Sequence, residues 1–186
     1  MKQTKKDMIE EPLITNLQDS YEFRTIHPEE GDIAASIEAI CFPPNEACIP
    51  SIMKERVRLA SELFLVAIDK ANEKMIGYIT GITTDEPNLR DEFFTDTSLH
   101  NPEGDYFMIL SVAVLPEYRC QGLAGAMMAE HLKRQRAAGR KAAVLTCLES
   151  KVLFYKKMGY VDEGISDSSW GGENWHEMRY LIEDYQ

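Results

Sequence analysis

Phe107-Met-Ile-Leu-Ser-Val-Ala-Val-Leu-Pro-Glu-Tyr-Arg-Cys-Gln-Gly-Leu-Ala-Gly-Ala-Met-Met-Ala-Glu-His-Leu-Lys-Arg-Gln-Arg-Ala-Ala-Gly139 combines the patterns of a strand, a turn and a helix. An apolar run ends at Pro116, a polar turn with Arg119, Gly122 and Gly125 follows, and a helical pattern then continues to Gly139. A strand that feeds a glycine-containing turn and then a helix directs backbone N–H groups at one point, where the helix dipole favours negative charge. This order predicts a phosphate-binding turn.

Strand and helix patterns alternate on both sides of this stretch. Apolar runs predict about seven strands, near residues 20–26, 63–68, 75–82, 107–115, 142–147, 160–163 and 175–182. Helical spacing predicts about four helices, near residues 28–41, 50–62, 122–138 and 149–158. We therefore expect a mixed α/β sandwich in one domain over residues 20–186, with a polar tail at 1–19. The long polar segment 83–105 is expected to be a lid or binding loop.

The spacing of apolar side chains predicts which helix faces are buried. Three helices are expected to bury Ile33, Ile37, Ile40 and Cys41; Met53, Val57 and Ala60; and Leu123, Met127, Met128 and Leu132. His131, on the long helix, is expected to be solvated. The four cysteines form no C-x-x-C pair, so the sequence does not indicate a metal site or a dithiol redox motif.

The composition narrows the class of protein. The formal net charge is −11, from 31 acidic and 20 basic side chains, which argues against nucleic acid as a partner and is compatible with cationic substrates such as amines. No apolar run approaches the roughly 20 residues that cross a bilayer. We expect a cytoplasmic protein without a membrane partner, as a monomer or a homodimer.

Two motifs resemble those of one superfamily. Arg119, Gly122 and Ala124 fit the [QR]-x-x-G-x-[GA] pattern of motif A of the GNAT superfamily of acyl-CoA-dependent N-acyltransferases. The segment 144–160, with Phe154, Tyr155 and a terminal Gly-Tyr, resembles its motif B. Upstream, Cys41-Phe-Pro-Pro-Asn-Glu-Ala47 is similar to the F-P-x-x-E-A loop of serotonin (arylalkylamine) N-acetyltransferases, where it lies beside the amine site.

The resemblance implies a splayed sheet that holds acetyl-CoA as co-substrate beside the motif A strand. The pantetheine is then expected on the backbone of Val112, Ala113 and Val114. The pyrophosphate is expected on the turn formed by Arg119, Cys120, Gln121, Gly122, Leu123, Ala124 and Gly125. Phe154 is expected to contribute to the cofactor site and to be the core-facing neighbour of Tyr155. No metal is expected.

Tyr155 is the catalytic residue that the resemblance implies. Acyl transfer from a thioester needs an amine lone pair at the carbonyl and a proton for the leaving thiolate. A thiol has a pKa of about 8.5 and a phenol about 10, so a positioned tyrosine can donate that proton. We therefore expect an acetyl-CoA-dependent N-acetyltransferase that acts on a small primary amine, with Tyr155 as general acid.

The acceptor of the amine proton is a separate question. The serotonin enzymes use two histidines on the motif A strand, but the matching positions here are Met108 and Leu110. Candidate replacements are Glu46, which ranks first on family position, and Asp105, Ser111 and Glu149. Two alternatives stay open: a non-catalytic acyl-CoA-binding module that lost its proton relay, and an acetyltransferase for protein or peptide N-termini.

Overall fold

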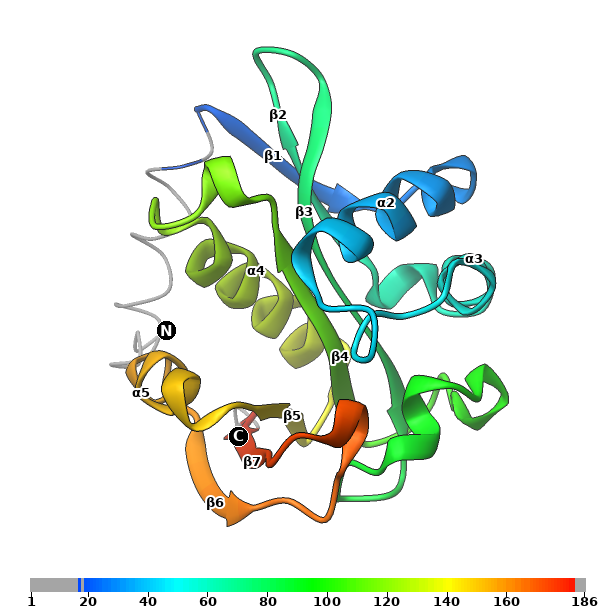
Figure 1. Cartoon of the computed structure of the whole chain (residues 1–186), viewed down its shortest axis with the longest axis vertical. Coiled ribbons are helices and arrows are strands. Elements are labelled where there is room, and N and C mark those ends of the chain that lie inside the picture. The colour runs from blue at the N-terminus through cyan, green and yellow to red at the C-terminus, as the bar shows by residue number, and fades with distance from the viewer. Residues whose placement is uncertain (1–16, 18, 183–186) are drawn as a thin grey trace.

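The computed structural model describes residues 17 and 19–182 of the 186-residue chain, so the predicted tail at 1–19 lies almost wholly outside the described residues. One seven-stranded sheet runs through the molecule in the order β1-β2-β3-β4-β5-β7-β6 (Figure 1). Its strands are β1 (Tyr21–Thr25), β2 (Leu65–Asp69), β3 (Lys74–Thr84), β4 (Tyr106–Val114), β5 (Ala142–Cys147), β6 (Val161–Ile165) and β7 (His176–Leu181). All seven predicted strands are present, and the mixed α/β class is confirmed.

Helices cover both faces of this sheet. On one face lie α2 (Gly31–Cys41) and α3 (Pro50–Leu59), and on the other lie α4 (Leu123–Ala137) and α5 (Glu149–Lys157) (Figure 1). The alternation of β2 shows the two layers, because Leu65 and Ala67 pack with the α4 side whereas Val66 and Ile68 pack with the α2 side. None of the described helices is long and apolar enough to cross a bilayer.

The sheet opens between its two central strands. β4 pairs along its length with β3 in antiparallel register, but it pairs with β5 in parallel register only at Tyr106–Met108, opposite Ala142–Val144. Beyond that point β5 continues to pair with β7 on its other side. One edge of β4 from Ile109 to Val114 therefore faces a gap. This is the splayed sheet that the sequence motifs imply.

A bulge interrupts the pairing of β3 with β4 beside this gap. The register shifts between Thr80 and Gly81, so that Ser111 is opposite Thr80 and Ile109 is opposite Gly81, with Leu110 unmatched. An extra residue in one strand breaks the simple alternation of side chains. Leu110 and Ser111 consequently lie on the same side of β4, toward α2 and α3, where Leu110 joins a cluster with Met108 and Phe93.

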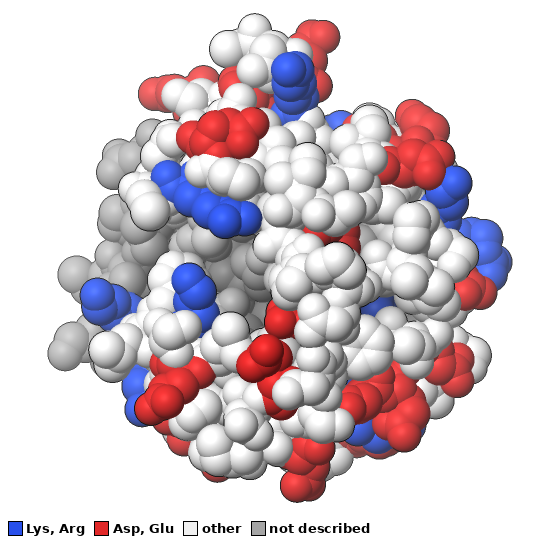
Figure 2. Space-filling model, viewed as in Figure 1, with Lys and Arg blue, Asp and Glu red and all other residues white. Residues whose placement is uncertain are grey.

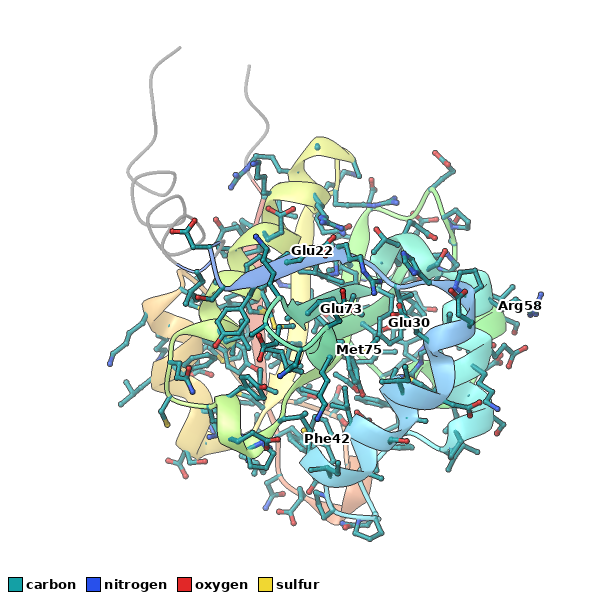
Figure 3. The ribbon with its side chains drawn as sticks, turned by 90° about the horizontal axis from the view of Figure 1, so that it is seen from above. Glu22, Glu30, Phe42, Arg58, Glu73 and Met75 are labelled. Carbon is teal, nitrogen blue, oxygen red and sulfur yellow. The ribbon has the colours of Figure 1, made fainter. Side chains whose placement is uncertain are left out.

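The buried faces of α3 and α4 are those that the sequence predicts, whereas that of α2 is predicted only in part, because Ile37 is buried and Cys41 packs against the core. Ile33 and Ile40 are 47% and 59% exposed, and the buried residues are Gly31, Ala34, Ala35, Ile37 and Glu38. Small side chains let α2 lie close to the strands, which rotates the helix away from its isoleucines. Figure 3 views this layer from above, with Phe42 at the end of α2 and Arg58 extending outward from α3.

His131 on α4 is buried, and the expectation that it is solvated is wrong. Its ring stacks on Phe107 at 4.5 Å, Nε2 lies 2.8 Å from the carbonyl of Leu63, and Nδ1 lies 3.1 Å from the amide of Gln135. A neutral imidazole satisfies both contacts, as donor to Leu63 and acceptor from Gln135. Burial lowers the pKa of His131 to about 4, so the ring is neutral at pH 7.

Candidate active site

The free edge of β4 presents backbone polar groups to the gap. Leu115 donates its N–H to Ile76 of β3, so the alternation of an antiparallel ladder turns Ala113 toward β3 and turns Val112 and Val114 the other way. Of the three residues predicted to bind pantetheine, Val112 and Val114 thus offer backbone groups to the gap. All three residues are in register with β3, but the backbone groups of Ala113 are turned toward Tyr78 of that strand.

The turn between β4 and α4 folds back onto the end of this edge. Arg119 donates from Nε to the carbonyl of Val114 at 2.8 Å, which fixes the direction in which the turn leaves the strand. Cys120 and Gly122 then adopt left-handed conformations, with φ of 60° and 84°. Residues 119–122 are all exposed. The predicted pyrophosphate turn is therefore an open loop at one end of the gap.

Neither glycine of this turn is explained by packing within the described protein. A Cβ added to Gly125 would meet nothing within 4 Å, and one added to Gly122 would meet only a Leu17 methyl at 4.0 Å. Gly122 supplies no side-chain cap to α4, and the first helical hydrogen bond near it is donated by Ala126. Apart from the Leu17 methyl, no described atom lies close to these two positions, which leaves room for a diphosphate at the N-terminus of α4. The residues present fit the phosphate end of coenzyme A.

Tyr155 lies on the opposite side of the gap, next to the end of β5. Its ring is half-buried and makes edge contacts with Phe154 and Tyr160, with centroid distances of 5.1 and 5.7 Å. Burial, and then the nearby thiol of Cys147, raise the pKa of Tyr155, so the phenol is protonated at neutral pH. Phe154 is 40% exposed, so the expectation that it faces the core is wrong.

Three loops far apart in the sequence meet over the α2 side of the site. The Trp170 indole donates to the carbonyl of Glu46 at 2.9 Å and stacks on Phe94 with centroids 4.8 Å apart. The side chain of Asn45 donates to the carbonyl of Gly171 at 2.6 Å. We call this assembly of residues 42–49, 91–94 and 168–175 the clasp. The segment 83–105, predicted to be a lid or binding loop, contributes its middle part to it.

Glu46 is held in the clasp beside another carboxylate. It is half-buried, and its pKa is raised first by burial and then by the charge of Glu173. Within residues 19–182, no cation forms a salt bridge with either of them. Two neighbouring carboxylates without a protein cation give this end of the site a negative potential, which favours a cationic ligand.

The other predicted proton acceptors have different surroundings. Asp105 forms a 2.5 Å ion pair with Lys141 at the closed end of the β4–β5 pair, away from the phosphate turn. Glu149 is exposed at the start of α5. Ser111 is 6% exposed and lies on β4 beside the bulge, where its hydroxyl donates to Glu38 at 3.1 Å.

Glu38 is the buried acid that the sequence motifs did not reveal. It is 2% exposed, and its carboxylate accepts hydrogen bonds from the Tyr78 hydroxyl, the Ser111 hydroxyl and the backbone N–H of Cys48. Burial raises its pKa, against the opposing effect of these donors. The signal in the sequence is its spacing, because Glu38 follows Ala34 by four residues on the face that α2 buries.

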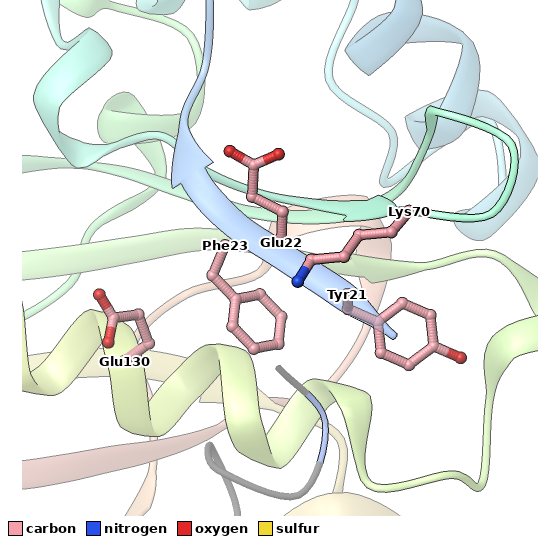
Figure 4. Close-up of a pocket in the computed structure, with 5 residues that line it drawn as sticks. All are labelled: Tyr21, Glu22, Phe23, Lys70 and Glu130. Carbon is pink, nitrogen blue, oxygen red and sulfur yellow. The ribbon is translucent and has the colours of Figure 1, made fainter. Parts of the chain in front are cut away.

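The surface around the gap is charged unevenly. Figure 2 shows a hollow between the surface over α4 and the surface over β4, with basic side chains on the first rim and acidic side chains on the second. A separate hollow lies between β1 and α4, lined by Tyr21, Glu22, Phe23, Lys70 and Glu130 (Figure 4). Because that hollow mixes both charges and contains none of the predicted site residues, we do not assign it to the reaction.

Solved structures share the fold. The loading GNATL domain of CurA from Lyngbya majuscula matches with a TM-score of 0.74 and 18% identity, over 87% of this chain and 98% of that one. The GphF GNAT-like decarboxylase in complex with isobutyryl-CoA matches with 0.72 and 15%, over 87% and 100%. Spermidine/spermine N-acetyltransferase SpeG from Vibrio cholerae, in complex with manganese ions, matches with 0.61 and 13%, over 89% and 95%.

The sequence itself identifies the family. No curated protein matches it significantly. The model of the acetyltransferase (GNAT) domain, however, matches residues 60–162, which is more than half of the chain and includes β2 to β5, the turn of residues 119–125 and Tyr155. The open sheet, the turn at the head of α4 and this match agree, and the chain belongs to the GNAT acetyltransferase family.

Proposed function

We propose that this protein is an N-acetyltransferase that moves an acetyl group from acetyl-CoA to a small primary amine. The observation that carries the proposal is the free edge of β4, which runs into an open, glycine-lined turn at one end and faces Tyr155 across the gap. The backbone of Val112 and Val114 would hold the pantetheine. The N–H groups of residues 119–125 would hold the pyrophosphate, and the exposed Phe154 would lie beside the ligand.

In this proposal Tyr155 is the general acid. The bound thioester supplies an activated acyl carbon, and the leaving sulfur needs a proton as its bond to that carbon breaks. The Tyr155 hydroxyl carries that proton at neutral pH, because burial raises its pKa. Among the described residues its hydroxyl has no hydrogen-bond partner, so the proton is free to be donated to a ligand.

The acceptor is proposed to be cationic. Glu46 and Glu173 place two carboxylates at the clasp that form no salt bridge among the described residues, on the side of the gap away from the 119–125 turn. This pair supports an amine, which carries a positive charge before it reacts. Glu46 would hold that ammonium group. The likeness of residues 41–47 to the serotonin N-acetyltransferase loop favours an aryl- or alkylamine, and the arylalkylamine branch and the cytoplasmic location stay predictions.

The test is turnover with a panel of amines. Purified protein is incubated with acetyl-CoA and aryl-, alkyl- and polyamines, and acetylated product is measured by mass together with released thiol. Tyr155→Phe is expected to lower kcat about 10²-fold while coenzyme A affinity is unchanged. Tyr160→Phe is the matched control, because it removes a neighbouring phenol hydroxyl from the same aromatic cluster.

The outcomes separate the alternatives. Coenzyme A binding without transfer to any amine or peptide identifies a non-catalytic acyl-CoA-binding module. Transfer to peptide N-termini and to none of the small amines identifies an acetyltransferase for protein or peptide N-termini. Failure to bind coenzyme A contradicts the whole assignment of the gap.

A further inference from the structure

Glu38 reaches the reactive face of β4 from a different element. It belongs to α2, yet its carboxylate meets Ser111 on β4, Tyr78 on β3 and the backbone of Cys48 in the 42–49 segment of the clasp. Ser111 is the next residue along β4 after Leu110, whose apolar side chain lies in one buried cluster with that of Met108. The bulge turns Ser111 to this same side of the strand.

Ser111 joins the strand that borders the gap to the buried acid on α2. Its neighbour Val112 presents its backbone to the gap, whereas its own hydroxyl hydrogen is directed at Glu38 at 3.1 Å. A serine hydroxyl that donates to a carboxylate still has lone pairs for a second donor. Ser111 is 6% exposed and Glu38 2%, and Ser111 belongs to the strand whose edge faces the gap, whereas Glu38 belongs to α2 on one side of that strand.

The charged and titratable groups around Glu38 come from every element packed against it. They are Cys41 on α2, Arg56 on α3, Cys48 in the loop and Tyr78 on β3. Burial raises the pKa of both thiols and of Tyr78, so these three are neutral at pH 7. Arg56, which donates to the carbonyl of Phe94 at 2.6 Å, is the one cation of the set and stabilises the ionised carboxylate.

We propose that Ser111 and Glu38 form the route by which the acceptor ammonium loses its proton. The inference rests on the proposed function. Ser111 takes a proton from the ammonium nitrogen as it passes its own hydroxyl proton to the Glu38 carboxylate. The amine nitrogen then has a lone pair for the acyl carbon, and Ser111 and Glu38 are thereby ready to return the proton to water once the product leaves.

The protons and bonds balance over one turnover. A C–N bond forms and the C–S bond breaks, with the electron pair going to sulfur. Tyr155 protonates the sulfur and regains a proton from the nitrogen, which becomes the amide. The one remaining proton, from the ammonium, is the proton that Ser111 and Glu38 carry. Ser111 is the group that meets the substrate, and Glu38 acts through it as a positioning residue.

A purely structural role for Glu38 makes a different prediction. Its hydrogen bonds to Tyr78 and Cys48 tie α2 to the sheet and to the loop, so a structural role predicts a loss of activity that is the same at every pH. A proton route predicts a loss that depends on pH, since an amine that is already deprotonated in solution no longer needs the route.

The experiment compares four variants with the natural protein. Glu38→Gln and Ser111→Ala break the route at each end, and Ser111→Thr keeps the hydroxyl. Thr80→Val is the matched control, because Thr80 lies opposite Ser111 and its buried hydroxyl has no partner in the described structure. Each is assayed for kcat/KM from pH 6 to 10 with the best amine, for coenzyme A affinity and for thermal unfolding. Infrared difference spectra follow the protonated carboxyl band.

The expected result is a pH-dependent loss. Glu38→Gln and Ser111→Ala lose about 10²-fold in kcat/KM near pH 7 and recover toward the pKa of the amine, with coenzyme A affinity unchanged. Ser111→Thr and Thr80→Val keep the natural profile. A titrating infrared carboxyl band is present in the natural protein and missing from Glu38→Gln.

Three results overturn the inference. One is an unchanged pH profile in both route variants, another is an equal loss at every pH, and the last is a carboxyl spectrum that Glu38→Gln does not alter. If Glu38→Gln does not fold, Ser111→Ala decides by the same criteria. If the natural protein acetylates no amine, the proposed function has failed, and the route fails with it.

Discussion

The indole N–H of Trp170 donates a 2.9 Å hydrogen bond to the backbone carbonyl of Glu46, which is 124 positions away in the chain. The same indole stacks on Phe94, so one side chain joins all three segments of the clasp. Trp170 thereby fixes the place of the Glu46 carboxylate, although it does not contact that carboxylate itself. The geometry of the acceptor end depends on a residue outside the family-model match.

Replacing Trp170 is expected to affect binding of the amine and not binding of coenzyme A. Trp170→Phe keeps a ring for Phe94 and loses the N–H donor, so we expect a loss of about 1 kcal/mol in the free energy of unfolding. The KM for the amine should rise while the affinity for coenzyme A is unchanged. Urea unfolding, steady-state kinetics and calorimetry measure the three quantities. An equal loss of amine and coenzyme A binding would show that the clasp does not belong to the acceptor end alone.

Gly125→Ala is predicted to have opposite effects on stability and on binding. Alanine is a better helix former than glycine by about 1 kcal/mol, and the new methyl meets no protein atom within 4 Å. The thermal midpoint should therefore rise. If the space belongs to the pyrophosphate, the same methyl should weaken coenzyme A binding. A stabilised variant with natural coenzyme A affinity would show that the pyrophosphate does not bind beside Gly125.

Cys120 offers a chemical probe of the same turn. It is exposed between Arg119 and Gly122, whereas Cys147 is buried and burial raises its pKa to about 11. Because the thiolate is the reactive form, iodoacetamide at pH 8 should label Cys120 long before Cys147. Coenzyme A should slow the labelling of Cys120, as followed by peptide mass. Labelling at the same rate with saturating coenzyme A would contradict the predicted contact.

His131 predicts an acid-dependent loss of stability. Its folded pKa of about 4 lies below the ordinary value of about 6.5, so the unfolded chain binds the proton more tightly. The stability it contributes is present above pH 6.5 and is lost as the pH falls toward 4, by about 3 kcal/mol in all. His131→Gln removes this dependence. Urea unfolding of both proteins at several pH values measures the difference, and parallel curves would refute the assignment.

The strand, turn and helix of residues 107–139 could be predicted from the sequence because every signal in that stretch is local. An apolar run, a proline, two glycines and a helical pattern follow one another from Phe107 to Gly139, and short-range order is what sequence patterns report. The splay beside β4 was expected from the family resemblance alone. The splay depends on which strands pair with β5, and the sequence of a single segment does not determine this pairing.

The burial of Glu38 and the contacts of the clasp could not be predicted from the sequence, for two different reasons. The α2 helix exposes Ile33 and Ile40 and buries Ala34 and Glu38, although the isoleucines gave the stronger hydrophobic signal. The contact between Trp170 and Glu46 joins residues that no local pattern connects. In the candidate site, the local secondary structure was predictable, and the contacts between distant segments were not.

The short seam between β4 and β5, at Tyr106–Met108, leaves the sheet as two plates that share one narrow hinge. A molecule lying along the open edge of β4 and against the end of β5 bridges both plates at a distance from that hinge. Occupancy would therefore stiffen the whole sheet as well as its immediate surroundings, and slower amide exchange in β6 and β7 would report it.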